Sequence, residues 1–307
     1  MKTLIYQTLI SIYKIVPGKK IICQLLKIAR IPNSKFYKDL KFNGQFVVET
    51  SNEVTFKLWH HGGQIENETF WKGLFVSWES DTGWIWKELC QFSNTIFDVG
   101  ANTGIYSMVA KTINPNSKVF AFEPSIHTYK KLLLNNKINK FDIKCEQIAL
   151  SNYNGKQVFF DTPNSNQTSA SLSPEKLKNW EGYSGEIFEY EVQTLTLADY
   201  IKNKSIENID LIKMDIEMHE PEAISGLGAY LKEYKPIVVI EVLSDIIADK
   251  LNELINNDEH VIFHLQGDKK AQLVEKFSWT YPCWNYLFFH KDLIEKIKLH
   301  TTLYKRH

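Results

Sequence analysis

The sequence predicts an α/β fold in which helices cover both faces of a doubly wound, mostly parallel sheet. From residue 94 onward, short apolar runs alternate with amphipathic runs at helical spacing, and short connections join them. Two of the apolar runs, "IDLIKMDIE" and "PIVVIEVL", are nearly continuous, as in parallel strands that are buried on both faces. With 307 residues and a 44% hydrophobic composition, the chain can build the large core that such a sheet requires.

Residues 1–92 are predicted to form an extension that precedes the sheet. Residues 1–45 read as two short helices with linkers at Pro17-Gly18 and Pro32-Asn33. Residues 46–92 show strand-like alternation in "VTFKLW" and predict a small cap that contains strands. Five of the eight tryptophans lie in this cap: Trp59, Trp71, Trp78, Trp84 and Trp86. Most of these rings are expected to form the core of the cap, with one or two facing a ligand.

The main domain is expected over residues 93–291, starting with the strand "TIFDVG" and a helix from Gly104. The strand "KVFAFEP" and the helix "IHTYKKLLLNNK" follow, and "FDIKCEQIAL" reads as a third strand. A long polar loop over 161–185, with Trp180 and Tyr183, precedes the strand-like "IFEYEVQTLTL". Near the end, "HVIFHLQ" and "CWNYLFFH" can pair as an antiparallel hairpin, and residues 292–307 are expected to form a helical tail.

Charge and cysteine content narrow the class of protein. Lys+Arg and Asp+Glu both total 36, so the whole chain carries no net field that would recruit nucleic acid or an anionic membrane. Four scattered cysteines without CxxC spacing indicate reduced thiols and a cytoplasmic protein. No run reaches the ~20 apolar residues of a membrane span. At residues 1–30 a helix packed on the body is favoured, with weak peripheral membrane contact as the alternative. The sequence does not indicate the oligomeric state.

The turn "FDVGANTG" after the first strand is the first candidate binding site. Gly100 can adopt backbone angles that are closed to other residues, and Gly104 lets the next helix start close to a ligand. A dinucleotide fingerprint would need a third glycine, and Asp98 beside the turn would repel a pyrophosphate. The motif therefore fits a cofactor with a zwitterionic tail better than NAD.

A carboxylate ends the second predicted strand. Glu123 follows Gly104 by nineteen residues, and from this position it can accept hydrogen bonds from both hydroxyls of a ribose. Taken alone, Glu123 would be read as a surface carboxylate. Its spacing from the glycine turn favours the binding interpretation.

The candidate catalytic residues lie in "KMDIEMHEPE" at the end of the fourth strand. Asp215 and Glu217 are two apart and point the same way if the strand persists, and His219 and Glu220 follow at the start of the next helix. His219 is the first choice for a general base, because an unperturbed imidazole (pKa about 6.5) is largely unprotonated at neutral pH. Glu217 or Glu220 could orient it or act as the base.

Simpler roles for the same residues stay open. Asp215 could anchor the amino group of a cofactor, and Glu220 could only stabilise the helix N-terminus. No metal is expected, although Asp215, Glu217 and Glu241 offer oxygen ligands to Mg²⁺ as a minor alternative. Lys213 is expected to bury its aliphatic stem and pair with a neighbouring carboxylate.

Five blocks of the sequence resemble the successive signatures of the FkbM family of S-adenosylmethionine-dependent methyltransferases. They are "FDVGANTGIYSMVA", "VFAFEP", "ALSN", "LTLADYI" and "IDLIKMDIEMHEPEAISGL", and together they span roughly residues 94–243. The resemblance implies a seven-stranded class I methyltransferase sheet and methylation of a hydroxyl, often on a sugar or glycan.

The resemblance also implies a set of contacts for S-adenosylmethionine. The methionine part would lie against Asp98, Gly100, Ala101, Asn102 and Gly104, the ribose against Glu123, and the adenine beside Ala149, Leu150 and Ser151. Further cofactor contacts are expected from Tyr106, Pro124, Ser125 and Asp215. Two positions depart from the family pattern: "IALSN" offers no Asp for the adenine amino group, and Met218 stands where the family has Gly.

The sequence therefore predicts a cytoplasmic O-methyltransferase that acts on a hydroxyl of a saccharide or a glycosylated metabolite. A carboxylate or amine of another small metabolite is the alternative acceptor. An inactive, cofactor-binding scaffold in glycan assembly is the alternative outside enzymes. A small-molecule or glycan partner is expected, and nucleic acid is not.

Overall fold

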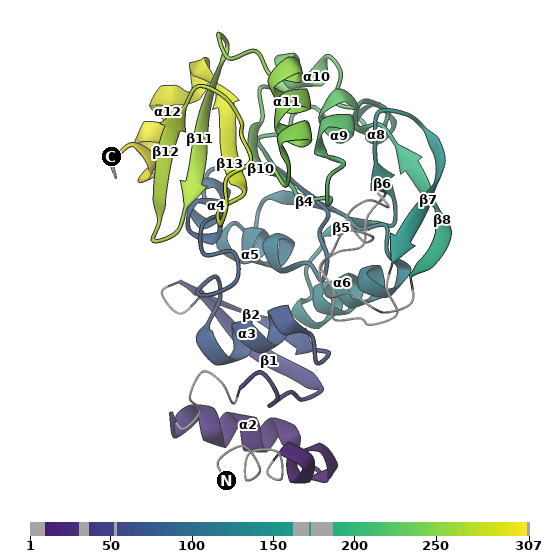
Figure 1. Ribbon diagram of the computed structural model, residues 1–307, viewed down its shortest axis with the longest axis vertical. Helices are drawn as coiled ribbons and strands as arrows, with labels where there is room; N and C mark the ends of the chain where they lie inside the picture. Colours follow the sequence, from purple (N-terminus) through teal and green to yellow (C-terminus); the bar gives the residue numbers. More distant parts are fainter. Residues whose placement is uncertain (1–9, 31–36, 52–53, 162–171, 173–186, 306–307) are drawn as a thin grey trace.

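The computed structural model describes residues 10–30, 37–51, 54–161, 172 and 187–305 (Figure 1). A large sheet lies at the centre, in the strand order β12-β11-β13-β10-β9-β3-β4-β5. The neighbouring parallel strands are β5 (Lys144–Glu146), β4 (Lys118–Phe122), β3 (Thr95–Val99), β9 (Leu211–Met214) and β10 (Ile237–Glu241). The predicted mostly parallel α/β sheet is confirmed.

The other edge of the sheet is antiparallel. β13 (Asn285–His290) runs antiparallel between β10 and β11 (His260–Gln266), which confirms the expected pairing of the last two apolar runs. The sheet has eight strands instead of the expected seven, because β12 (Lys270–Val274) pairs with the outer side of β11. Asp268 and Lys269 adopt positive φ angles in the short turn that folds β12 back.

Helices cover both faces of this sheet. One apolar core lies between the sheet and α4 (Gly83–Cys90), α5 (Ile105–Ile113), α6 (Ile126–Asn139) and α12 (Ile294–His300). A second core, on the opposite face, packs against α8 (Leu197–Lys204), α9 (Glu220–Ser225) and α11 (Asp245–Leu254). Alternate strand residues serve the two cores: Ile96 points into the first and Phe97 into the second. The remaining helical turns are α10 (Tyr230–Tyr234), η1 (Lys291–Leu293) and η2 (Leu303–Lys305).

The strand order fixes where a ligand can bind. From β3 the chain first adds β4 and β5 on one side, and then returns to add β9 and β10 on the other. The connections diverge at the carboxyl ends of β3 and β9, which is where open α/β sheets bind their ligands.

A second, three-stranded sheet lies beside the large one, in the order β6-β8-β7. Its strands are β6 (Ala149–Leu150), β7 (Gly155–Asp161) and β8 (Phe188–Leu195). The run "FDIKCEQIAL" was expected to be one strand, but it divides into β5 in the large sheet and β6 in the small one. The predicted long loop at 161–185, with Trp180 and Tyr183, lies outside the described residues except for Asp161 and Leu172.

The N-terminal part contains two short helical segments and a hairpin. Residues 10–15 are helical, and α2 (Lys19–Ile28) follows the Pro17-Gly18 break. β1 (Gly44–Ser51) pairs antiparallel with β2 (Val54–His60), and α3 (Gln64–Lys72) follows. α2 lies at the end of the molecule farthest from the large sheet, beyond this hairpin (Figure 1). The division of the chain at residues 92 and 291 stays a prediction.

The tryptophans of the N-terminal part contribute to the core, as expected. Trp84 and Trp86 are buried, and Trp71 and Trp78 pack against the same apolar cluster from its edge. Within the described ranges, no helix is both long enough and apolar enough to pass through a membrane.

Candidate functional site

A cavity of about 740 Å³ opens at the carboxyl ends of β3, β4, β9 and β10. The segment between α3 and α4 and the segment before β13 form its opposite wall. Its charged lining residues are Glu79, Asp81, Glu123, Lys213, Asp215, Glu217 and Glu241, and His219 also lines it. The cavity therefore brings together side chains from both predicted motifs, the glycine turn and the fourth-strand cluster.

The glycine turn forms one side of this cavity. Gly100 has a φ of +78°, and a Cβ at this position would lie 1.8 Å from the backbone oxygen of Asp215. Only glycine lets the ends of β3 and β9 approach so closely. Ala101 and Asn102 also line the cavity, and Asn102 holds a positive φ of 52°. This turn lies where the sequence predicted a ligand.

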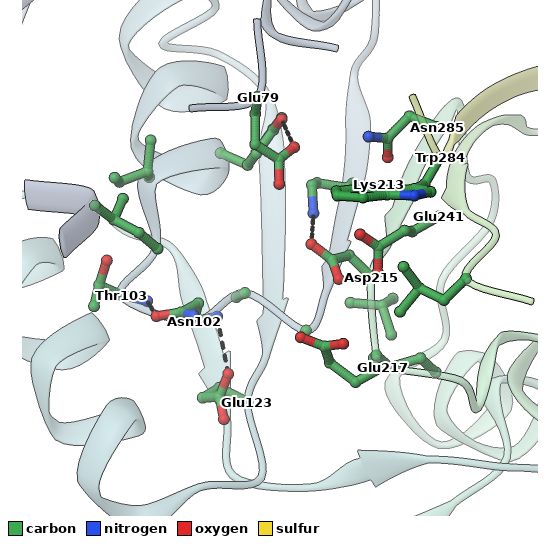
Figure 2. A pocket seen from close by; sticks show the side chains of 18 of the residues that line it. Glu79, Asn102, Thr103, Glu123, Lys213, Asp215, Glu217, Glu241, Trp284 and Asn285 are labelled. Atoms are coloured by element: carbon green, nitrogen blue, oxygen red, sulfur yellow. Dashed lines mark hydrogen bonds and ion pairs between the residues drawn. The ribbon is translucent and has the colours of Figure 1, made fainter. Parts of the chain in front are cut away.

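Glu123 lies beneath the same turn and is 7% exposed. Its Oε2 accepts a hydrogen bond from the backbone N–H of Asn102 at 2.9 Å, and its Oε1 accepts one from Ser125 N–H at 2.9 Å (Figure 2). Burial raises the pKa of Glu123 to about 7, although these two N–H groups oppose the shift. A group that donates hydrogen bonds to this carboxylate would favour its ionised form.

Several predicted contact residues line the cavity, and others lie behind it. Tyr106, Pro124, Ala149 and Leu150 are in the lining, in addition to the residues already described. The predicted residues that do not line the cavity are Asp98, Gly104, Ser125, Ser151 and Glu220.

The residues behind the lining support it. Asp98 is fully buried and accepts a hydrogen bond from Ser107 Oγ at 2.6 Å. Gly104 was expected to let a ligand approach, but a Cβ there would lie 2.5 Å from the Leu132 side chain. Gly104 is therefore required for packing against α6 and for its φ of +88°. Ser125 N–H holds Glu123 in place.

An ion pair lies on the side of the cavity opposite the glycine turn. Lys213 Nζ lies 2.8 Å from Asp215 Oδ2 and 4.4 Å from the centre of the Tyr106 ring. Burial would lower the pKa of Lys213, but the negative charges of Asp215, Glu79 and Asp98 outweigh burial and raise it. The buried stem and paired ammonium expected for Lys213 are confirmed. Figure 2 shows Asp215 between this ammonium and Glu241.

Backbone geometry explains one departure from the family pattern. Glu217 and Met218 both adopt positive φ angles, of 60° and 77°. At such angles a residue with a side chain is strained and glycine is not. The glycine that the resemblance implies at position 218 would therefore suit this backbone, and the Met218 side chain packs on the second core.

His219 lines the cavity at the N-terminus of α9. Its Nε2 lies 3.0 Å from Ser151 Oγ, and its Nδ1 lies 3.9 Å from Glu222 Oε2. Burial lowers the pKa of His219, which favours the neutral form of the ring. Glu220 is fully buried and accepts a hydrogen bond from Ile216 N–H at 2.9 Å, which fixes the turn.

Glu79 is a lining residue that was not identified from the sequence. It precedes α4, far from both motifs, and no spacing rule connects it with them. Its Oε2 accepts hydrogen bonds from Tyr106 Oη and from Thr82 Oγ1, the latter at 2.9 Å. Burial raises its pKa to about 6, and Asp215 adds to the shift while Lys213 opposes it. Its φ of 51° places it in a strained region, as is common at functional sites.

Two tryptophans line the cavity together with the carboxylates. Trp78 stacks on Phe75 and meets the edge of Tyr106, with ring centres 6.0 Å apart in both cases. Trp284 lines the cavity with Asn285, whose Nδ2 donates to Asp81 Oδ2 at 2.9 Å. Figure 2 shows Trp284 beside Glu241 and Asp215. Trp284 was not identified in advance, since "CWNYLFFH" signals only a buried strand.

The possible magnesium site is not formed by the residues that the structure describes. Among them, no group of three or more His, Cys, Asp or Glu side chains is arranged to hold a metal ion. Asp215, Glu217 and Glu241 all line the cavity, but they do not make such a group.

A model of a known protein family matches the central part of the chain. Residues 98–265 match the model of the methyltransferase FkbM domain. The methyltransferase sdnD of Sordaria araneosa is 28% identical over 169 residues, which are 48% of this chain and 65% of the relative. The hexuronic acid methyltransferase AglP of Haloferax volcanii is 21% identical over 62% of this chain and 72% of its own length. The chain thus spans less than two thirds of sdnD.

A likeness to solved structures is also found. The crystal structure of methyltransferase FkbM from Methylobacillus flagellatus covers 74% of this chain and 55% of its own, with 14% identity and a TM-score of 0.42.

Proposed function

The chain belongs to the FkbM methyltransferase family, and from this premise we propose that it is an O-methyltransferase that uses S-adenosylmethionine. The proposed acceptor is a hydroxyl of an uncharged sugar or of a glycosylated metabolite. One observation carries the proposal: a single cavity is lined by the glycine turn with Glu123 on one side and by Glu79, Asp215 and Glu241 on the other.

The residues of the glycine turn fit this cofactor. The volume of about 740 Å³ lies within the range of small-molecule sites and leaves room for two ligands. Glu123 offers a carboxylate to ribose hydroxyls, and Ala149 and Leu150 offer an apolar border to a base. When bound, the cofactor supplies a methyl group on a positively charged sulfur.

The charge of the cavity favours a sulfonium compound over a dinucleotide. Among the described residues, six carboxyl groups line it, and the ammonium of Lys213 is paired with one of them. Among the described lining residues no unpaired cation would balance a pyrophosphate, whereas these carboxylates attract a sulfonium and an ammonium.

Glu123→Ala is expected to weaken S-adenosylmethionine binding at least about tenfold, since a hydrogen bond to a charged group contributes about 1.5–3 kcal/mol. Isothermal titration of the cofactor, and of NAD as the competing dinucleotide, measures this. Glu146→Ala is the matched control, because Glu146 ends the neighbouring strand β5 without lining the cavity. Tight NAD binding with no S-adenosylmethionine binding would refute the cofactor assignment.

We propose Glu79 as the general base that takes the proton of the acceptor hydroxyl. Its pKa of about 6 leaves it largely ionised at neutral pH and close to the optimum for proton transfer. Within the described part of the chain, the Tyr106 and Thr82 hydroxyls both donate to its Oε2, and we assign Oε1 to the substrate. His219, the choice from the sequence, is instead assigned to orient the turn through Ser151.

The other side chains of this wall suit a polyhydroxyl acceptor. Asp215, Glu241 and Asn285 can accept or donate hydrogen bonds to several hydroxyls at once, and Trp284 offers an aromatic face to a sugar ring. The carboxylates disfavour an acidic sugar, in contrast to the hexuronic acid named for AglP.

Trp284→Ala is expected to raise the KM for the acceptor about three- to tenfold, because the stacking surface is lost. The affinity for the cofactor should not change. Trp279→Ala is the control, since Trp279 is 48% exposed in the same segment and does not line the cavity. Equal KM values for the two variants would show that Trp284 does not contact the acceptor.

Mass spectrometry of candidate acceptors, incubated with the protein and the methyl donor, tests the activity itself. A gain of one methyl group on a hydroxyl of neutral glycosides supports the proposal. Methylation of amines or carboxylates alone would favour the alternative nucleophiles. Cofactor binding without turnover across the panel, unchanged by Glu79→Gln, would favour an inactive scaffold.

A further inference from the structure

The neutral total charge of the chain conceals an uneven distribution. The first 38 residues contain eight Lys or Arg and no Asp or Glu, so the remainder holds 28 basic and 36 acidic residues. The N-terminal segment is therefore basic, while the body that contains the cavity is acidic. A field from this segment acts at short range even though the whole molecule is neutral.

Helix α2, in this segment, is apolar on two opposite faces. Ile22, Cys23 and Leu26 pack against the first core. On the other side Ile21, Leu25 and Ile28 are 62%, 61% and 78% exposed. Their spacing of four and three residues forms a continuous aliphatic stripe. The body of the protein therefore covers one apolar face of α2 and leaves the second exposed.

The helical turn at residues 10–15 repeats this arrangement. Tyr13 is buried and donates a hydrogen bond to the Lys41 carbonyl oxygen at 2.7 Å, which ties the turn to the body. Ile12 and Ile15 on the same turn are 50% and 82% exposed. The turn is thus held in place while its aliphatic side chains face solvent.

The basic side chains flank the exposed stripe. Lys14 and Arg30 are exposed, Lys19 and Lys20 are partly exposed, and the Lys27 ammonium donates to the Phe70 carbonyl oxygen. On a helical projection Lys20 and Lys27 lie between the buried and the exposed faces. Aliphatic side chains beside lysines are the composition of helices that lie in a membrane interface.

We propose that residues 10–30 bind the surface of an anionic lipid bilayer, with Ile21, Leu25 and Ile28 among the acyl chains. With ten residues, α2 would lie in the plane of the interface. A second copy of the chain fits this surface poorly, because two basic segments repel each other. The exposed residues of the stripe are all aliphatic, whereas protein interfaces favour aromatic anchors.

Vesicle flotation of the full chain tests the inference. Binding is expected to vesicles of phosphatidylcholine mixed with phosphatidylglycerol, weaker or absent on phosphatidylcholine alone, and reduced by added salt. The variant Ile21→Ser/Leu25→Ser/Ile28→Ser is expected to bind at least tenfold less. The variant Lys14→Glu/Arg30→Glu is expected to lose the preference for the anionic vesicles.

The matched control is Ile246→Ser/Leu273→Ser/Leu299→Ser, whose side chains are 65%, 58% and 75% exposed elsewhere on the molecule. This variant should bind vesicles as the parent does. No binding of the parent to anionic vesicles, or equal loss in both triple variants, would overturn the inference. The inference would also be overturned if light scattering showed a dimeric parent and a monomeric α2 variant, while the parent did not bind vesicles. The readout is independent of methyl transfer.

Discussion

Replacing Gly100 with alanine is expected to destabilise the protein by more than about 2 kcal/mol and to abolish cofactor binding. The backbone at this position has a φ of +78°, which costs a residue with a Cβ about 1–2 kcal/mol. The added Cβ would also lie 1.8 Å from the backbone oxygen of Asp215, so the ends of β3 and β9 must move apart. That movement would displace the turn and the carboxylate cluster together.

Gly228→Ala is the control that separates the effect of backbone strain from that of the steric clash at position 100. Gly228 has a positive φ of 55°, but nothing lies within 4 Å of a Cβ built there. Its substitution should lower the melting temperature only by about 2–4 °C, as expected for roughly 1 kcal/mol in a chain of this size, and leave cofactor affinity unchanged. Thermal unfolding and isothermal titration measure both quantities. Equal values for the two variants would mean that the close approach of β3 and β9 does not shape the site.

The parallel part of the sheet was predictable because its strands leave a direct signal. "IDLIKMDIE" and "PIVVIEVL" are apolar without alternation, and the structure buries both as β9 and β10 in the middle of the sheet. β12 gave a weak signal, since only Ala271 of its five residues is buried. A strand that contributes one side chain to the core cannot be distinguished by pattern from an exposed loop.

The division of "FDIKCEQIAL" into β5 and β6 could not be predicted from the sequence pattern either. Both pieces are strands, of three and two residues, and the break between them follows from their partners in different sheets. β6 pairs with β8, about forty residues later in the sequence. Partners at such separation are set by tertiary packing, which the periodicity of a single segment does not record.

The glycine-turn side of the cavity was predictable because short motifs at strand ends contain its residues, and the opposite wall was not. Glycine spacing and strand ends identified Gly100, Asn102 and Glu123, which all line the cavity. Glu79 and Trp284 come from segments far apart in the sequence, on either side of the sheet core. No motif joins them, and only the fold brings them to one cavity. The ends of predicted strands therefore locate the glycine-turn side of the cavity, and the opposite wall has to come from the structure.

Glu79→Gln is expected to lower the methylation rate about 10²–10⁴-fold, the usual contribution of a positioned general base. In the parent, kcat/KM should rise about tenfold per pH unit on the acidic side and level off above pH about 6, because the base acts only when deprotonated and the pKa of Glu79 is about 6. The variant should lose this rising limb. Glutamine keeps the size of the side chain, so cofactor affinity should change little.

Two further variants test the assignment of Glu79 as the general base. Tyr106→Phe removes a hydrogen bond that lowers the pKa of Glu79, so the rising limb should move to higher pH while a measurable rate remains. His219→Ala should leave the position of the limb unchanged, because His219 contacts Ser151 and not Glu79. If His219→Ala lost the rising limb of the pH profile and Glu79→Gln kept a near-normal rate, His219 would be the general base. The response of this titration to substitution of Glu79 and of His219 thus decides which wall of the cavity takes the proton.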